Sequence, residues 1–214
     1  MASTKHVKHL AKVDPILKEL MKRVKPQIYP LQDNYFRSLV RAIANQQLSG
    51  KAAQTILNRM VALFPKGEFP TPKQYLKMPD EKLRSAGFSF SKIAYTKNIA
   101  QFFIDREKEL KNIHELSDEE VIKLLTAVKG IGTWTAEMFL MSSLGREDIF
   151  SYGDLGLRKG LQKVYKFKKE PTLKQMQKIV DAWRPYRTHG ARYMWASLDS
   201  INSPQVAEPA KNDK

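Results

Sequence analysis

The chain has 214 residues, of which 42% are hydrophobic, and a formal net charge of +15 at pH 7. This length allows one globular unit or two small lobes with a real core. The absence of cysteine excludes disulfides, thiolate zinc sites and cysteine-bound iron–sulfur clusters. The excess of Lys and Arg favours a polyanionic partner such as nucleic acid, although a solvated basic surface would have the same composition.

The sequence also bears on where the protein works. No stretch approaches the roughly eighteen consecutive apolar residues of a membrane helix. The basic N-terminus, residues 1–12, lacks the apolar region of a secretory signal. We therefore expect a soluble intracellular protein that does not associate with membranes.

In chain order, the pattern predicts helices almost throughout. Residues 1–13 are predicted to be irregular, within a basic N-terminal arm that covers 1–25. Apolar residues then recur at helical spacing, and capping boxes at 117–120 and 172–175 each open a further helix. Residues 204–214 are predicted to be a disordered tail. Because sustained period-two alternation is missing, the sequence predicts an all-α body over 26–203.

Histidines are few, and their spacing gives little support for a metal site. The chain has His6, His9, His114 and His189. His6 and His9 could share a helical face, but terminal histidines are more often solvated and the pattern supplies no further ligand. The sequence therefore favours two solvated imidazoles.

A tight turn between two helices is predicted at residues 128–136, where Gly130 and Gly132 stand one residue apart. A Gly-x-Gly hairpin between helices can direct backbone N–H groups at one phosphate. An ordinary helix–helix connector with a glycine C-cap has the same pattern, so both interpretations stay open.

Asp154 stands twenty residues after Trp134, where turn residues lead into a predicted helix. Asp is a favoured helix N-cap, so a structural role is compatible with a catalytic one. The helix dipole stabilises a carboxylate at this position. Such a group suits stabilisation of a developing cation better than donation of a proton.

Five blocks of sequence resemble, in order, the helix-hairpin-helix-GPD DNA glycosylases, most closely the alkylated-base branch (3-methyladenine DNA glycosylase II, Mag type). They are residues 41–53, 86–92, 125–136, 153–158 and 183–195. The resemblance implies two interleaved helical lobes, a helix-hairpin-helix motif at 117–145 and an active-site cleft between the lobes. It also implies base flipping, in which the damaged nucleotide leaves the helical stack.

The same resemblance implies roles for individual residues. Asp154 matches the catalytic aspartate. Three residues match base-pocket positions (Trp134, Met138 and Trp195), and two match the plug and wedge that enter the duplex (Gln47 and Leu48). The residues that match the phosphate-binding positions of the hairpin are Gly130, Ile131, Gly132, Thr133 and Thr135. The backbone carbonyls of Thr126, Val128 and Ile131 match a site for structural Na⁺ or K⁺, and no other cofactor is expected. Without the resemblance, Leu48 could simply end a helix, Gln47 could be a surface residue, and Trp195 could be core packing.

One position bears on the type of reaction. Bifunctional relatives place a catalytic lysine two residues after the second glycine of the hairpin, and here that residue is Trp134. A Schiff base cannot form there, so we expect a glycosylase without lyase activity. Ser151, Gly153 and Met138 depart from residues common in relatives, which suggests a narrow base range or weak activity.

The sequence thus predicts a DNA glycosylase that excises alkylated purines from double-stranded DNA. We expect a monomer, in the nucleus of a eukaryote or the cytoplasm of a bacterium. The alternative is a non-enzymatic or very weakly active helix-hairpin-helix protein that recognises damaged DNA. A basic RNA-binding protein is a third hypothesis, but the aromatic strand motifs of common RNA modules are missing.

Overall fold

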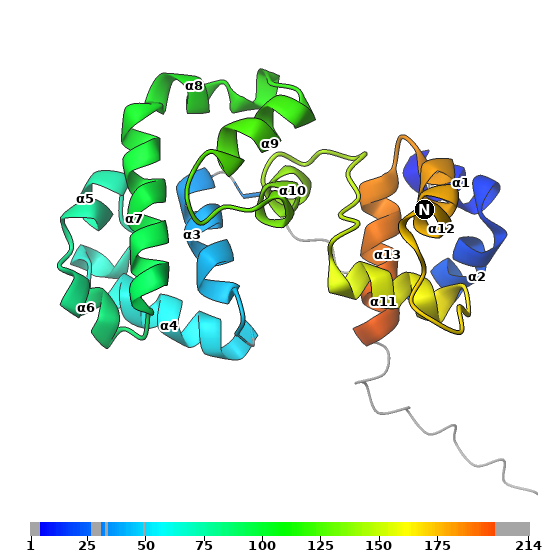
Figure 1. The fold of residues 1–214 in the computed structure, drawn as a ribbon, viewed down its shortest axis with the longest axis horizontal. Coiled ribbons are helices and arrows are strands. Elements are labelled where there is room, and N and C mark those ends of the chain that lie inside the picture. The colour runs from blue at the N-terminus through cyan, green and yellow to red at the C-terminus, as the bar shows by residue number, and fades with distance from the viewer. Residues whose placement is uncertain (1–4, 27–30, 33, 49, 200–214) are drawn as a thin grey trace, which may run out of the picture. The chain divides into compact units, whose positions relative to one another are not determined.

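The computed structural model describes residues 5–26, 31–32, 34–48 and 50–199. Within these ranges the regular structure is entirely helical, which confirms the predicted all-α fold class (Figure 1). Both predicted capping boxes are present: Ser117 and Glu120 open one helix, and Thr172 and Gln175 open another. Among the described residues, no helix combines the length and apolar character that a bilayer crossing requires.

The chain forms two compact units. Unit 1 combines Met1–Ile28 with Glu147–Lys214, and unit 2 is the intervening segment Tyr29–Arg146. One unit is therefore built from two segments that lie far apart in the sequence, as the predicted interleaving of two helical lobes requires. The predicted division into two lobes is confirmed, and the position of a cleft stays a prediction.

Among the described residues of unit 2, the longest helix is α7 (Phe90–Asp105), shown in green in Figure 1, and several other helices of the unit pack against it. Phe36 lies near the rings of Phe69, Tyr75 and Phe103 with centroid separations of 5.5–5.9 Å, which is a range typical of aromatic packing. The regular elements are α3 (Tyr35–Asn45), α4 (Gly50–Ala62), η1 (Pro65–Gly67), α5 (Pro72–Lys77), α6 (Asp80–Ser85), α7 (Phe90–Asp105), α8 (Glu107–Lys111), η2 (Ile113–Glu115), α9 (Asp118–Thr126) and α10 (Thr133–Ser142).

In unit 1, the helix that begins at Leu155 (α11) packs against the helix that begins at Arg187 (α13). Gly160 makes this contact close, because a Cβ atom there would lie 2.6 Å from the Met194 carbonyl oxygen. The regular elements of this unit are α1 (Lys5–Val13), α2 (Pro15–Arg23), α11 (Leu155–Val164), α12 (Leu173–Val180), η3 (Asp181–Trp183) and α13 (Arg187–Asp199).

The prediction of an irregular basic arm at the N-terminus is wrong for the described residues, which form α1 and α2. Leu10 and Leu17 are fully buried, so these helices belong to the core of unit 1. The buried carboxylate of Asp14 caps α2 through Leu17 N–H and accepts hydrogen bonds from Tyr165 (2.5 Å) and Trp183 (2.8 Å). The helices were missed because each has few apolar residues, such as Leu10 and Leu17, among many lysines. The predicted tail at 204–214 lies outside the described residues.

Candidate active site

The predicted hairpin is present between α9 and α10. Gly130 has φ 109°, a conformation that L-residues with a side chain rarely adopt, and this reverses the chain. The turn closes with a 3.0 Å hydrogen bond from Ile131 N–H to the Val128 carbonyl. Gly132 then begins α10 with no side-chain cap. An uncapped, exposed helix N-terminus of this kind presents N–H groups suited to an anion.

Helix α7 supports the hairpin through two residues that the sequence did not single out. A Cβ atom at Gly130 would overlap the ring of Tyr95, so this glycine permits close packing as well as an unusual φ. Asn98 donates a 3.3 Å hydrogen bond to the Lys129 carbonyl. By contrast, a Cβ atom at Gly132 would meet nothing within 4 Å. The space above Gly132 is therefore open to an incoming group.

Asp154 is the N-cap of α11, as its position before a predicted helix indicated. Its Oδ1 accepts hydrogen bonds from Leu157 N–H (2.7 Å) and from the indole Nε1–H of Trp195 (2.9 Å). The carboxylate is half-buried and lies at the positive end of the helix dipole. The N-cap role of Asp154 is confirmed, and its catalytic role stays a prediction.

A glycine allows Trp195 to reach this carboxylate. A Cβ atom at Gly156 would lie 3.0 Å from Trp195 Cδ1 and 3.1 Å from Asp154 Oδ1, which is tighter than ordinary packing. Gly156 therefore fits between the two side chains, and any larger residue would press on both. The block at 153–158 contained this glycine, but its role becomes visible only when α13 lies beside α11.

The segment that leads into the site is tied to the beginning of α13. Asp148 accepts a hydrogen bond from Arg187 Nε (2.8 Å) and one from Arg184 (2.9 Å). Thr188 N–H donates to the Glu147 carbonyl (2.9 Å), and its hydroxyl accepts from Ile149 N–H (3.0 Å). Residues 147–149 are thus fixed on both sides, which limits the conformations open to the loop before Asp154.

The other predicted pocket residues lie in unit 2. Trp134 and Met138 are four residues apart on α10, so they share one face of the helix. Trp134 is 41% exposed, which is unusual for so large an apolar side chain, and Met138 is half-buried. The structure therefore brings Asp154 and Trp195 together within unit 1, and Trp134 and Met138 together within unit 2.

The predicted plug and wedge occupy the turn after α3. Gln47 has φ 57°, an uncommon conformation for a residue with a side chain, and Leu48 is 41% exposed. Backbone conformations of this kind are often found at functional sites. The structure thus presents an apolar side chain to solvent from a constrained turn.

Lys92 fixes this turn from α7, a role that the sequence did not reveal. Its ammonium group donates 2.8 Å hydrogen bonds to the carbonyls of Ala44 and Gln46, at the end of α3. A cation at a helix C-terminus satisfies exposed carbonyls and interacts favourably with the dipole. Burial lowers the pKa of Lys92 from its ordinary value. Lys92 therefore links α7 to the residues that precede Gln47 and Leu48.

The comparisons with known proteins agree with this geometry. Residues 40–185 match the model of the HhH-GPD superfamily of base excision DNA repair proteins. The chain belongs to this superfamily. The matched residues include the hairpin, the Gln47–Leu48 turn and Asp154, whereas Trp195 lies beyond them.

Several members of the superfamily are similar over nearly the whole chain. The DNA-3-methyladenine glycosylase 1 of Schizosaccharomyces pombe is 37% identical over 213 residues, covering 98% of this chain and 93% of that protein. The alkylbase DNA glycosidase-like protein mag2 of the same yeast is 31% identical and covers 88% and 90%, respectively.

Solved structures of superfamily members are also similar. The 3-methyladenine DNA glycosylase of S. pombe in complex with abasic DNA has a TM-score of 0.81 at 37% identity, covering 90% of this chain and 95% of that chain. A DNA-3-methyladenine glycosidase from Bacillus halodurans has a TM-score of 0.82 at 35% identity and covers 94% and 92%, respectively.

Proposed function

We propose that this chain is a monofunctional DNA glycosylase that flips alkylated purines of the 3-methyladenine and 7-methylguanine type out of DNA and excises them. The observation that carries the proposal is the pairing of Asp154 with Trp195, which sets a carboxylate beside an aromatic ring in a member of a base excision repair superfamily. The substrate class follows from the similarity to glycosylases named for 3-methyladenine.

The chemistry suits a carboxylate with no strong acid beside it. Alkylation at purine N3 or N7 gives the base a positive charge, so the base is already a good leaving group. The barrier then lies in the sugar, which gains oxocarbenium character as in glycoside hydrolysis. In the proposed mechanism Asp154 stabilises that cation and positions the attacking water. The bonds from Leu157 and Trp195 hold the carboxylate in place before the substrate arrives.

Aromatic residues account for the preference for a cationic base. We assign Trp134, Met138 and Trp195 to the base pocket, where the faces of the indole rings would attract an electron-poor purine through cation–π interaction. Met138 offers a polarisable thioether in place of a third ring. Selectivity for alkylated bases would then rest on charge as much as on shape.

DNA binding is assigned to two parts of unit 2. The hairpin residues Gly130, Ile131, Gly132, Thr133 and Thr135 would bind one phosphate through the uncapped end of α10. Gln47 and Leu48 would fill the gap left by the flipped nucleotide and so offset the cost of unstacking. Carbonyl oxygens of Thr126, Val128 and Ile131 are the hard donors that Na⁺ or K⁺ prefers, and a monovalent ion bound there would stabilise the turn.

The absence of lyase activity is part of the proposal. A lyase needs an amine that attacks the sugar, and Trp134 supplies none at the position where bifunctional relatives have lysine. We further propose that the protein acts as a monomer in the compartment that holds the DNA, which is the nucleus in a eukaryote and the cytoplasm in a bacterium.

An excision assay tests the proposal. Duplex DNA treated with a methylating agent is incubated with the protein, and released bases are separated from the polymer. We expect free 3-methyladenine or 7-methylguanine, intact strands until alkali is added, and no covalent complex after borohydride reduction. Binding of methylated DNA without base release would instead support a non-enzymatic damage-recognition protein, and strand cleavage without alkali would contradict the monofunctional assignment.

A further inference from the structure

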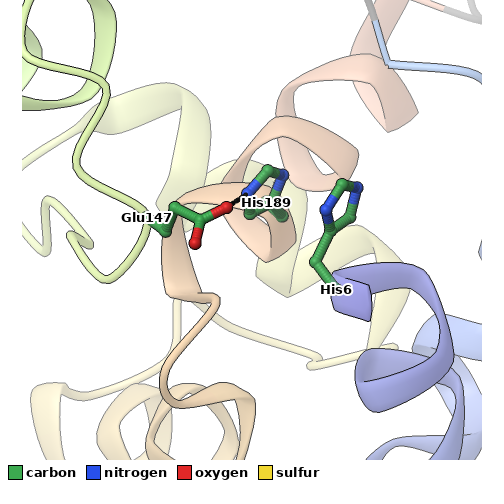
Figure 2. Close-up of side chains that lie close together, drawn as sticks. All are labelled: His6, Glu147 and His189. Carbon is green, nitrogen blue, oxygen red and sulfur yellow. Dashed lines mark hydrogen bonds and ion pairs between the residues drawn. The ribbon is translucent and has the colours of Figure 1, made fainter. Parts of the chain in front are cut away.

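Three potential metal ligands meet in unit 1. They are His6 on α1, Glu147 in the segment before α11, and His189 on α13, and their ligand atoms all lie within 4.8 Å of one another. Figure 2 shows the His189 ring between the other two side chains. The sequence pattern favours a solvated His6, but in the structure His6 packs against another histidine.

The cluster has direct contacts on both sides of His189. Its Nε2 lies 3.0 Å from Glu147 Oε1, which is hydrogen-bonding distance. The His6 and His189 rings are stacked, with centroids 3.7 Å apart and an interplanar angle of 9°. Two imidazoles and a carboxylate are the donor set of many zinc sites in which water completes the tetrahedron.

The backbone around two of the ligands is firmly held. The N–H of Thr188, the residue next to His189, donates to the Glu147 carbonyl at 2.9 Å. Asp148, the residue after Glu147, pairs with Arg187. Glu147 and His189 are therefore placed together before any ion arrives, and His6 would have to leave its stacked position and move closer to join them.

We propose that His6, Glu147 and His189 form a binding site for one Zn²⁺ ion per chain. The ion takes the place of the proton that His189 and Glu147 share, and that proton moves to the other ring nitrogen of His189. His6 supplies the third ligand and a water molecule the fourth. The nearby positive charge of Arg192, three residues after His189 on α13, repels a cation and so lowers the affinity of the site.

Such a site would fasten the N-terminal helix to the rest of unit 1. His6 belongs to the segment Met1–Ile28, whereas Glu147 and His189 belong to Glu147–Lys214. An ion that binds the folded chain but not the unfolded chain stabilises the folded chain by mass action. The melting temperature should therefore rise with the Zn²⁺ concentration. Zn²⁺ binding is measured without DNA, so its failure can be told apart from a failure of the proposed function.

Calorimetric titration of the full, tag-free chain with Zn²⁺, after removal of metals by a chelator, tests the site. We expect one ion bound per chain, a rise in melting temperature with Zn²⁺, and no such rise with Mg²⁺, which prefers oxygen ligands. His6→Gln, Glu147→Gln and His189→Gln should each weaken binding by about tenfold or more, the size of loss seen even for outer ligand-supporting groups.

His114→Gln is the matched control, because His114 lies in unit 2 and also has a glutamate neighbour, Glu115, at 3.8 Å. It should bind Zn²⁺ as the wild type does. If His189→Gln does not fold, His6→Gln and Glu147→Gln decide the question, since both residues lie at the edge of the cluster. The proposal would be overturned if the wild-type protein binds no Zn²⁺. It would also be overturned if the His6→Gln and Glu147→Gln variants bind Zn²⁺ as tightly as the wild type does.

Discussion

Trp195 and Asp154, 41 residues apart in the sequence, are joined by a 2.9 Å hydrogen bond from the indole Nε1–H to Oδ1. The same oxygen accepts the capping bond from Leu157 N–H. The carboxylate is therefore oriented from two elements, α11 and α13. This relationship explains how a single aspartate at the start of a helix can act both as a cap and as a placed charge.

Gly156→Ala should slow base excision without destabilising the fold. The added methyl group would press on Trp195 and Asp154 at 3.0–3.1 Å and disturb their hydrogen bond. Replacing glycine by alanine within a helix favours the helix by up to about 1 kcal/mol, so the melting temperature should stay constant or rise. Single-turnover excision rates and thermal unfolding, measured together, separate the two effects.

Gly153→Ala is the control for that variant, because a Cβ atom there meets nothing within 4 Å although Asp154 is the next residue. It should excise at close to the wild-type rate. Equal rates for Gly156→Ala and Gly153→Ala would show that the Trp195–Asp154 contact does not matter for excision.

Gly132→Val should weaken binding to DNA of any sequence while the protein stays folded. The position is exposed and has an ordinary φ of −95°, so the side chain fits but would fill the space in front of the N-terminus of α10. Gly130→Val differs, since φ 109° and the Tyr95 ring both oppose a side chain, and it should lower the melting temperature. Binding titrations with unrelated duplexes check this; unchanged affinity in folded Gly132→Val would exclude the hairpin as the phosphate site.

The helix ends and turns of the candidate site could be predicted from the sequence, because each depends on residues that are close together in the chain. Both capping boxes, the Gly130–Gly132 turn and the N-cap position of Asp154 depend on residues within a few positions of one another. The contacts of Trp195 with Asp154, of Tyr95 with Gly130 and of Lys92 with the end of α3 join distant segments. The spacing of residues along the chain does not indicate these long-range contacts.

The N-terminal helices could not be predicted for a related reason. Leu10 and Leu17 are buried, and their helices contact η3, α11 and α13 in the other segment of unit 1. Asp14 hydrogen-bonds with Tyr165 and Trp183, which lie more than 150 residues later in the sequence. Lysine-rich helices of nine residues have little stability alone and form because of that packing.

Lys92→Met should impair excision most where the lesion is well paired. Without its ammonium group, the carbonyls of Ala44 and Gln46 lose their partner and the turn that carries Leu48 is less constrained. Leu48→Ala should show the same selectivity, because a mismatched base is already easier to extrude. Excision rates on paired and mismatched substrates measure the ratio.

Lys97→Met provides the control for the loss of charge on α7, since Lys97 pairs with Asp80 rather than with the turn. It should lower the rate on both substrates alike or leave both unchanged. A Lys92→Met variant with the same ratio of rates as Lys97→Met would argue that Lys92 has no role in positioning the turn.

Tyr75 should make the fold sensitive to alkaline pH. Burial raises its pKa from 10.0 to about 12, and its hydroxyl donates a 2.8 Å hydrogen bond to Thr96. Above pH 10 the Tyr75 hydroxyl ionises in the unfolded chain while it is still protonated in the folded protein. The contribution of the protonated hydroxyl to folding stability is therefore complete below pH 10 and is lost as the pH rises from 10 to about 12. Two pKa units correspond to about 2 to 3 kcal/mol.

Denaturant unfolding at a pH below 10 and at a pH between 10 and 12 measures this loss. Tyr75→Phe lacks the ionisable hydroxyl, so it should start less stable but lose less on the change of pH. A loss as large as that of the wild type would show that other groups, such as the half-buried Tyr165, whose pKa is also raised by burial, account for the effect.

The role of Asp154 is tested most directly by the single-turnover rate of base release from methylated duplex DNA by Asp154→Asn. Asparagine keeps the size and the capping oxygen but not the charge. We predict that base release is lost while DNA affinity stays within a few-fold of the wild type. Base release at the wild-type rate by a folded Asp154→Asn protein would contradict the assignment of Asp154 as the group that stabilises the sugar cation.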